Sequence, residues 1–130
     1  GGCLLLGVGP TSDGVIEEEV AKRLHEVGEW LRANGKAIYN TRITPVYQDG
    51  HTWFTADKDG QTLYAIYALP EGETLPEVIE WAGNLPKGKM KMLKGNKSVK
   101  YTCDGDKVKV FLPKGIKNEP IALQFKVRAK

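Results

Sequence analysis

The chain has 130 residues and a mass of 14.4 kDa, which leaves room for one domain with a modest hydrophobic core. Hydrophobic residues make up 41% and charged residues 27%, a globular balance, and no apolar run approaches the ~20 residues of a membrane-spanning helix. The net charge of +3 is unevenly distributed, because the residues from Lys87 onward include thirteen basic and three acidic side chains.

Residues 4–8 are predicted to form a buried strand. They show no alternation of apolar and polar side chains, which is typical of a parallel strand covered on both faces. Gly9-Pro10 and Asp13-Gly14 end the strand and form a loop. A parallel strand needs partners that arrive through crossover connections, and no second strand–helix alternation follows. We therefore expect the partner strands to precede Gly1 in a longer protein.

A helix is predicted from about residue 17 to residue 33. Its apolar side chains recur at helical spacing: Ile16, Val20, Leu24, Val27 and Leu31. Three glutamates at 17–19 fall in the first turn, where the helix dipole favours negative charge, and Asn34-Gly35 supply a left-handed stop. Trp30 widens the apolar stripe, so the helix is expected to contact neighbours on more than one side.

After residue 42 the sequence pattern changes to short segments of alternating polarity, typical of β-strands. Residues 37–42 form a short link, and Pro45 and Asp49-Gly50 mark the change. The predicted strands cover 51–56, 62–69, 78–82, 89–92, 99–103, 107–112 and 121–127. The strongest hairpin signal is Asp104-Gly105. About seven short strands, each with a turn signal, predict an antiparallel β-sandwich.

The glycine-rich turn at 7–14 does not fit a nucleotide-binding loop. Ser12 stands where a dinucleotide fingerprint has its third glycine, and Val15-Ile16 stand where a phosphate loop has Lys and Ser/Thr. A tight turn capped by Ser12 or Asp13 is the favoured interpretation. The carboxylates of Asp13 and residues 17–19 are too close along the chain to flank a sugar, so they are interpreted as capping residues.

No spacing of cysteine or histidine predicts a metal site or a cofactor. Cys3 and Cys103 lie on different predicted strands and are interpreted as small buried side chains. Trp53 and Trp81 are assigned to the core, although exposed tryptophans in a groove would suit sugar stacking.

The lysines of the C-terminal half are interpreted as a solvated sheet face. Five of them fall at outward positions of neighbouring strands: Lys89, Lys91, Lys100, Lys107 and Lys109. Arginine is scarce there, and no aromatic residues interleave with the lysines, as a nucleic-acid stacking platform requires. A polyanion-binding module is therefore the least favoured alternative, and no nucleic-acid partner is expected.

Two motifs resemble a known enzyme family. Residues 2–14 read GCLLLGVGPTSDG, and residues 23–42 read RLHEVGEWLRANGKAIYNTR. Together they resemble the end of the catalytic domain in the α-L-fucosidases of glycoside hydrolase family twenty-nine, with the pattern GNLLLNVGPTxDGxI followed by RLxxxGxWLxxNGxAIYxTR. The closing strands resemble the C-terminal β-sandwich of that family more weakly, so the resemblance covers essentially the whole chain.

This resemblance implies an α+β fragment made of two parts. Residues 1–41 would be the last strand and helix of a truncated (β/α)8-like catalytic domain, and residues 42–130 a C-terminal β-sandwich domain. The family's Asp nucleophile and acid/base carboxylate fall on earlier strands and loops, so no catalytic residue is expected in this chain. We therefore expect a non-catalytic C-terminal fragment of a retaining α-L-fucosidase, which removes terminal α-L-fucose from glycans without a metal or other cofactor.

The resemblance also implies partners and a location. The expected partners are a fucosylated glycan, through the parent enzyme, and the missing N-terminal portion of the barrel; the location would be periplasmic, secreted or lysosomal. Cys3 and Gly7 stand where the family usually has Asn, so no substrate-contacting residue is carried over. Pro10 and Thr11 are candidates for the rim of the pocket. The alternative function is an autonomous carbohydrate-binding β-sandwich module.

Overall fold

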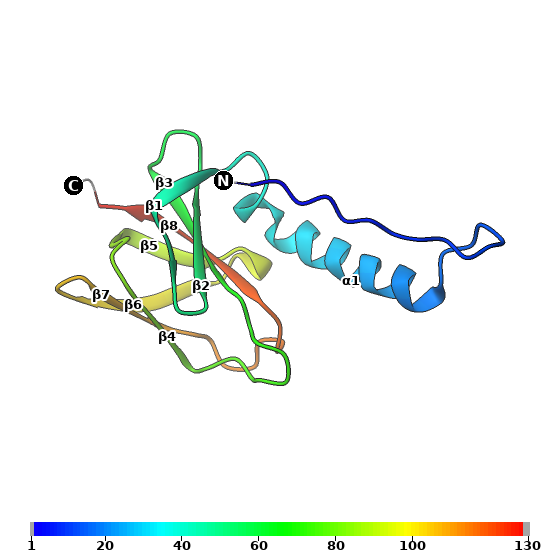
Figure 1. The fold of residues 1–130 in the computed structure, drawn as a ribbon. Helices are drawn as coiled ribbons and strands as arrows, with labels where there is room; N and C mark the ends of the chain where they lie inside the picture. Colours follow the sequence, from blue (N-terminus) through cyan, green and yellow to red (C-terminus); the bar gives the residue numbers. More distant parts are fainter. Residues whose placement is uncertain (1, 129–130) are drawn as a thin grey trace.

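The computed structural model describes residues 2–128, which form one α-helix, two short 3-10 turns and eight β-strands (Figure 1). The helix α1 spans Glu18–Asn34 and leads into the 3-10 turn η1, Gly35–Ala37; the second turn, η2, spans Lys94–Asn96. The strands are β1 (Arg42–Asp49), β2 (Thr52–Ala56), β3 (Thr62–Tyr67), β4 (Val78–Ala82), β5 (Pro86–Met92), β6 (Ser98–Asp104), β7 (Lys107–Phe111) and β8 (Ile121–Val127).

The eight strands belong to one antiparallel sheet that folds over on itself. Its order is β1-β2-β3-β8-β5-β6-β7-β4. The first five strands in that order form one layer and the last three form the other. The sheet turns between β5 and β6, which pair only through Met90 with Val99 and Lys91 with Ser98. The predicted β-sandwich is therefore realised as a single, nearly closed sheet.

An aromatic stack holds the two layers together. Trp81 of β4 stacks on Phe125 of β8 with ring centroids 5.8 Å apart, and it meets Phe54 of β2 edge-on at 5.5 Å. All three side chains are buried, which confirms that Trp81 belongs to the core. Trp53 was predicted to be buried as well, but it is 43% exposed. Successive side chains of a strand point to opposite faces, so Phe54 turned inward leaves Trp53 outward.

Strand β1 was not predicted, because Pro45 and Asp49-Gly50 were interpreted as marking the change of pattern before a first strand at residue 51. The pairing of β1 with β2 shifts register between Ile43 and Gln48, around that proline. Proline cannot donate a ladder hydrogen bond, and β-sheets accommodate it on edge strands such as this one. With β1 included, the described residues form eight strands, one more than the seven predicted.

Side chains link the two edge strands of the sheet. At the end of β1, Asp49 Oδ2 accepts a hydrogen bond from the backbone N–H of Ala82 at the end of β4, over 2.6 Å. Asn84 Nδ2 donates to the carbonyl oxygen of Val46 over 2.8 Å. These two bonds satisfy groups that an open sheet edge would leave unpaired, and they close the sheet at this end.

The helix agrees with its predicted bounds to within one residue, but it ends differently. Gly35 has a φ of −58° and continues into η1, so the predicted left-handed stop is wrong. A Cβ atom at Gly35 would lie 2.7 Å from the ring of Tyr39, which explains why glycine stands here. Within residues 2–128 no helix is long and apolar enough to cross a bilayer.

Residues 4–8, predicted as a buried strand, form no strand. Leu4 and Leu5 are 89% and 96% exposed, and the segment runs alongside α1, outside the sheet (Figure 1). A strand is defined by backbone hydrogen bonds to a neighbour, and the described residues place no strand beside this segment. Cys3 is exposed for the same reason, contrary to prediction, whereas Cys103 is half-buried on β6.

The turn before α1 is held by a different residue than predicted. The backbone N–H of Val15 donates to Thr11 Oγ1 over 3.2 Å, and the Thr11 N–H donates to the Val15 carbonyl oxygen over 2.8 Å. Thr11 therefore takes the role that the sequence assigned to Ser12 or Asp13.

Replacing Asp49 by alanine tests the closure of the sheet. The substitution leaves the Ala82 N–H without its acceptor, and we expect a loss of about 1–2 kcal/mol in the free energy of unfolding. Urea unfolding followed by tryptophan fluorescence measures this loss. Asp49→Asn keeps an acceptor oxygen and is expected to retain most of the stability. An Asp49→Ala protein as stable as the unmodified chain contradicts the proposed closure.

Candidate functional site

Pro10 and Thr11 are both exposed and lie in the segment before α1, which is not part of the sheet (Figure 1). The cavities described below are lined by other residues, so the structure brings neither residue into a polar cluster. Their place at a pocket rim stays a prediction. Within residues 2–128 there is no group of three His, Cys, Asp or Glu side chains placed to hold a metal ion.

The lysines of the second layer point outward, as predicted. Lys100, Lys107 and Lys109 are exposed. Lys109 Nζ lies 3.1 Å from Glu80 Oε1 on the neighbouring β4, and Lys107 pairs in register with Asp104. Lys91 differs from the prediction because it is half-buried beside Gln124 of β8. Positive and negative side chains therefore share this sheet face.

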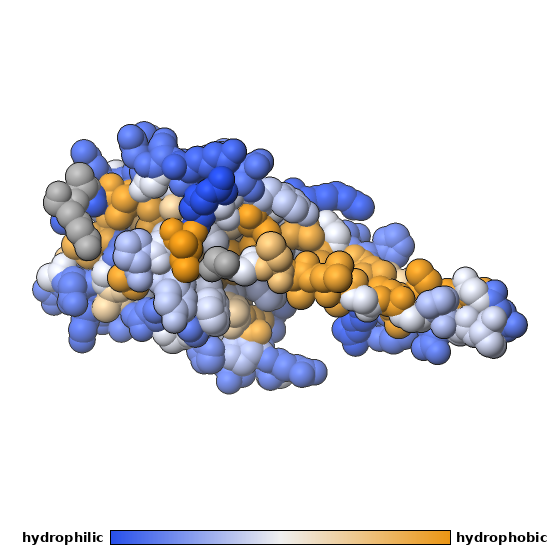
Figure 2. All heavy atoms as spheres, turned by 45° about the horizontal axis from the view of Figure 1, so that its top comes forward, coloured by the Kyte–Doolittle hydropathy of each residue, from blue (hydrophilic) through white to orange (hydrophobic). Residues whose placement is uncertain are grey.

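An apolar face covers the part of the molecule that projects from the sheet. We define it by six exposed side chains: Leu4, Leu5, Leu6, Val15, Ile16 and Val27. Figure 2 shows apolar residues gathered along this projecting arm, whereas polar residues cover most of the sheet in the same view. Monomeric proteins rarely leave so continuous an apolar surface in water, so it indicates an interaction surface.

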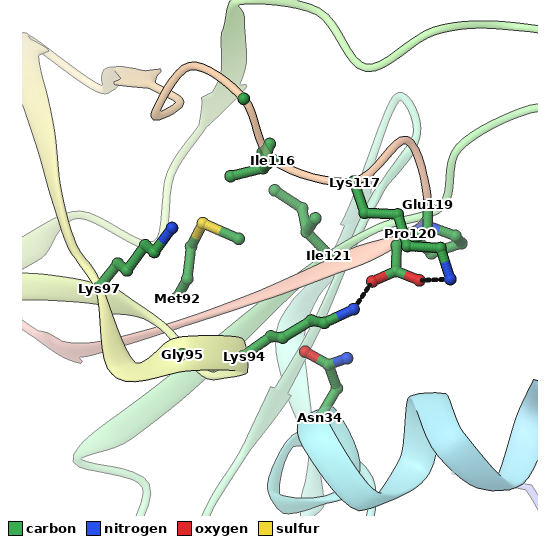
Figure 3. A pocket seen from close by; sticks show the side chains of 11 residues that line it. Asn34, Met92, Lys94, Gly95, Lys97, Ile116, Lys117, Glu119, Pro120 and Ile121 are labelled. Atoms are coloured by element: carbon green, nitrogen blue, oxygen red, sulfur yellow. Dashed lines mark hydrogen bonds and ion pairs between the residues drawn. The ribbon is translucent and has the colours of Figure 1, made fainter.

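A charged cluster joins η2 to the loop before β8, near the sheet end of α1. Glu119, in the loop before β8, accepts a hydrogen bond from Lys94 of η2, and its second carboxylate oxygen lies 3.3 Å from Lys117 Nζ (Figure 3). Partial burial raises the pKa of Glu119, but the hydrogen bonds and charges of the two lysines lower it by more, so this pKa lies below its ordinary value. Glu119 is therefore held as a carboxylate.

Two cavities flank this cluster, and both are lined by Lys94, Lys117, Glu119 and Pro120. The smaller cavity, of about 260 Å³, lies over Met92 and Ile121, with Asn34 at its side (Figure 3). The larger cavity, of about 620 Å³, lies between α1 and the end of β3 and is also lined by Val27, Trp30, Ile66 and Leu69. We call the larger one the helix–sheet cleft.

Asn34 is the polar residue most deeply placed at this junction. Its side chain is 1% exposed, and Nδ2 donates to the carbonyl oxygen of Trp30 over 3.2 Å. Its Oδ1 is buried and has no hydrogen-bond partner among residues 2–128. In Figure 3 the carboxamide extends from the end of α1 toward Lys94.

Trp30 connects the helix to the loop before β8. Its indole N–H donates to the carbonyl oxygen of Pro120 over 2.7 Å. No sequence pattern predicted this contact, because Trp30 falls in the apolar stripe with Val27 and Leu31. The two bonded residues are 90 positions apart, so no local pattern links them. The available signal was the run Asn118-Glu119-Pro120 directly before a strand, which marks a loop with polar groups that could bind another part of the chain.

Comparison with known proteins identifies the family. Residues 1–36 match the sequence profile of the family described as α-L-fucosidase. The bovine (Bos taurus) tissue α-L-fucosidase is 37% identical over 117 residues, which cover 87% of this chain and 24% of that protein. The plasma α-L-fucosidase of Rattus norvegicus is 40% identical over 70 residues, covering 52% of this chain and 15% of that protein.

A solved structure agrees with these matches. The crystal structure of a Thermotoga maritima α-fucosidase, in complex with a mechanism-based inhibitor, superposes with a TM-score of 0.74 and 27% identity. The match covers 95% of this chain and 30% of that one. The chain belongs to the α-L-fucosidase family. A family twenty-nine α-L-fucosidase from Bacteroides thetaiotaomicron has the same fold, with a TM-score of 0.73 at 23% identity.

The resemblance inferred from the two N-terminal motifs is therefore confirmed. The chain spans 15–24% of the length of the curated α-L-fucosidases compared above. The structural match extends over nearly all of the chain, so both the helical arm and the sheet belong to the fold shared with the fucosidase structures.

Glu119 makes the stability of the charged cluster dependent on pH. Its pKa is lower in the folded than in the unfolded chain, so the ionised carboxylate stabilises the fold above its ordinary pKa of 4.5. This stabilisation is lost as the pH falls through the lower folded-state value. Because both lysines are largely exposed to screening solvent, we expect Glu119→Gln to cost at most about 1 kcal/mol at neutral pH.

The measurement is urea unfolding of both proteins at neutral pH and at a pH below the folded-state pKa. The difference between them is expected to vanish at the acidic pH and to shrink in high salt. Glu80→Gln, which also removes a carboxylate paired with a lysine, but on the opposite layer, is the matched control. A stability difference for Glu119→Gln that stays constant with pH contradicts the assigned ionisation.

Proposed function

We propose that this chain is the C-terminal part of a retaining α-L-fucosidase, an enzyme that hydrolyses terminal α-L-fucose from glycans. The observation that carries the proposal is the combination of high coverage of this chain with low coverage of its relatives. The bovine match includes 87% of this chain but 24% of that enzyme. The chemistry would be a two-step displacement through a fucosyl-enzyme intermediate, with both carboxylates outside this chain.

The carboxylates of this chain support a non-catalytic role. A glycosidase needs a general acid that is protonated before it reacts, and so an acid with a raised pKa. Glu119 has a lowered pKa, because two ammonium groups contact its carboxylate. Glu19, in the first turn of α1, lies 3.2 Å from the guanidinium of Arg23 and is exposed on the helix surface. The environment of Glu119 therefore disfavours proton donation to a sugar.

The apolar face supports a structural role. We propose that residues 4–8 form the last strand of a (β/α)8-like barrel in the complete enzyme, and that α1 is its last helix. Burying a leucine side chain is worth about 1.5–3 kcal/mol, so the exposed leucines of this segment would stabilise docking on a catalytic domain. The division at residues 41 and 42 into barrel piece and sheet domain is part of this proposal.

Activity measurements test the proposed function. The purified chain is expected to show no hydrolysis of an aryl α-L-fucoside, because the nucleophile and the acid/base carboxylate lie elsewhere. A longer protein that contains this chain together with the preceding catalytic part is expected to hydrolyse the same substrate. Turnover by the purified chain contradicts the non-catalytic role, and an inactive longer protein contradicts the fucosidase assignment.

Charge substitutions on the apolar face test its structural role. The isolated chain is expected to self-associate in water through this face. Leu5→Lys combined with Val27→Lys is expected to shift it toward monomer without lowering its melting temperature, since both side chains are exposed in the fold. Light scattering coupled to size-exclusion chromatography measures the change. Thr102→Lys, on the exposed face of β6, is the control and should leave the association unchanged.

A further inference from the structure

The helix–sheet cleft has the size and composition of a ligand site. Its volume of about 620 Å³ lies within the range of ~300–1,000 Å³ that small-molecule sites occupy. Its walls come from four separate parts of the chain: α1, the end of β3, the loop before β8, and η2. The Trp30–Pro120 hydrogen bond fixes the first wall to the third.

Trp30 gives the cleft an oriented aromatic ring. Its N–H is engaged by the Pro120 carbonyl oxygen, so rotation of the ring would break a 2.7 Å hydrogen bond. The side chain is half-buried and is flanked in the cleft by the apolar side chains of Val27 and Leu69. A fixed aromatic ring beside aliphatic groups suits a ligand with a flat face of C–H bonds, such as a pyranose ring.

The polar groups of the cleft match hydroxyl groups. Glu26 and Glu29 of α1 present carboxylate oxygens, which accept hydrogen bonds; Glu26 Oε2 also lies 3.5 Å from Arg23 Nη1, which leaves Oε1 for a ligand. Lys117 presents an ammonium group with donors beyond its bond to Glu119. A sugar hydroxyl both donates and accepts, so it can satisfy either kind of group. The lining carries three glutamates and two lysines, with Lys94 and Glu119 paired. These charges nearly cancel, which favours a neutral ligand over an anion.

We propose that the helix–sheet cleft binds one pyranose ring of a neutral glycan, with Trp30 as the stacking platform and Glu26, Glu29 and Lys117 as hydroxyl partners. The proposal rests on the proposed function for the choice of fucosylated glycans as probes. Its chemistry rests on the cleft itself. It assigns to this chain a binding role that is separate from bond cleavage.

The three tryptophans provide a direct test by nuclear magnetic resonance. Each indole N–H gives its own signal in a spectrum of the isotope-labelled full chain, and these signals can be followed during titration with L-fucose, lactose and fucosylated lactose. We expect the Trp30 signal to shift and saturate. The signals of Trp81, which is buried in the core, and Trp53, which lies on the outer face of β2, are expected to stay in place.

Two matched variants separate stacking from a general effect. Trp30→Leu removes the ring and is expected to raise the dissociation constant by roughly tenfold or more. Trp53→Leu removes the other partly exposed tryptophan and should leave binding unchanged. Since Trp30→Leu also breaks the bond to Pro120, the double variant Glu26→Gln with Glu29→Gln serves as a second test on exposed helix positions. It is expected to weaken binding with the melting temperature unchanged.

Several outcomes overturn the proposal. One is that none of the three sugars gives a saturable shift. Another is that the Trp53 signal shifts and the Trp30 signal does not. The third is that both cleft variants bind the sugar with unchanged affinity. Tighter binding of glucuronate than of L-fucose, in a fourth titration of the same kind, overturns the inference of a neutral ligand. Failure of sugar binding leaves the fucosidase assignment untouched, because that assignment is tested by hydrolysis in the longer protein. Conversely, the sugar titration does not depend on turnover.

Discussion

The hydrogen bond from the Trp30 indole to the Pro120 carbonyl oxygen fixes the helix to the sheet, together with the bond from Thr55 Oγ1 to the Ala37 carbonyl oxygen just beyond the helix. The helix α1 and the segment before it project from the sheet, and the Trp30 bond fixes them to the loop before β8 at a distance of 2.7 Å. The charged cluster of Lys94, Glu119 and Lys117 lies beside it. One anchored junction thus sets both the shape of the cleft and the direction in which the apolar face points.

Local patterns in the sequence were sufficient to predict most of the sheet and the helix. The alternation in β8 placed Ile121, Leu123 and Phe125 inside, and all three are buried. The signal at Asp104-Gly105 marked the hairpin between β6 and β7. Strand β1 was missed because Pro45 counts against a strand unless it is known that the strand lies at an edge. Edge position is a property of the assembled sheet, so a single segment could not reveal it.

The candidate site was less accessible to sequence reasoning than the fold. The polar groups of the cleft come from α1, η2 and the loop before β8, and their partners are distant in the chain. Lys94 and Glu119 can pair because Lys94 follows β5, Glu119 precedes β8, and these two strands are neighbours in the sheet. Residues 4–8 illustrate the reverse case. Their uniform apolarity predicted a buried strand, but within the described residues this segment forms no strand and Leu4 and Leu5 are exposed.

The side-chain bonds between β1 and β4 have a consequence for how copies of this chain can meet. The side chains of Asp49 and Asn84 form hydrogen bonds with backbone groups at the sheet edge, where a strand of another molecule could otherwise pair. Cross-β stacking requires unpaired backbone groups at the sheet edges of every copy. We therefore expect copies of this chain to meet through the apolar face and not by pairing of these edge strands.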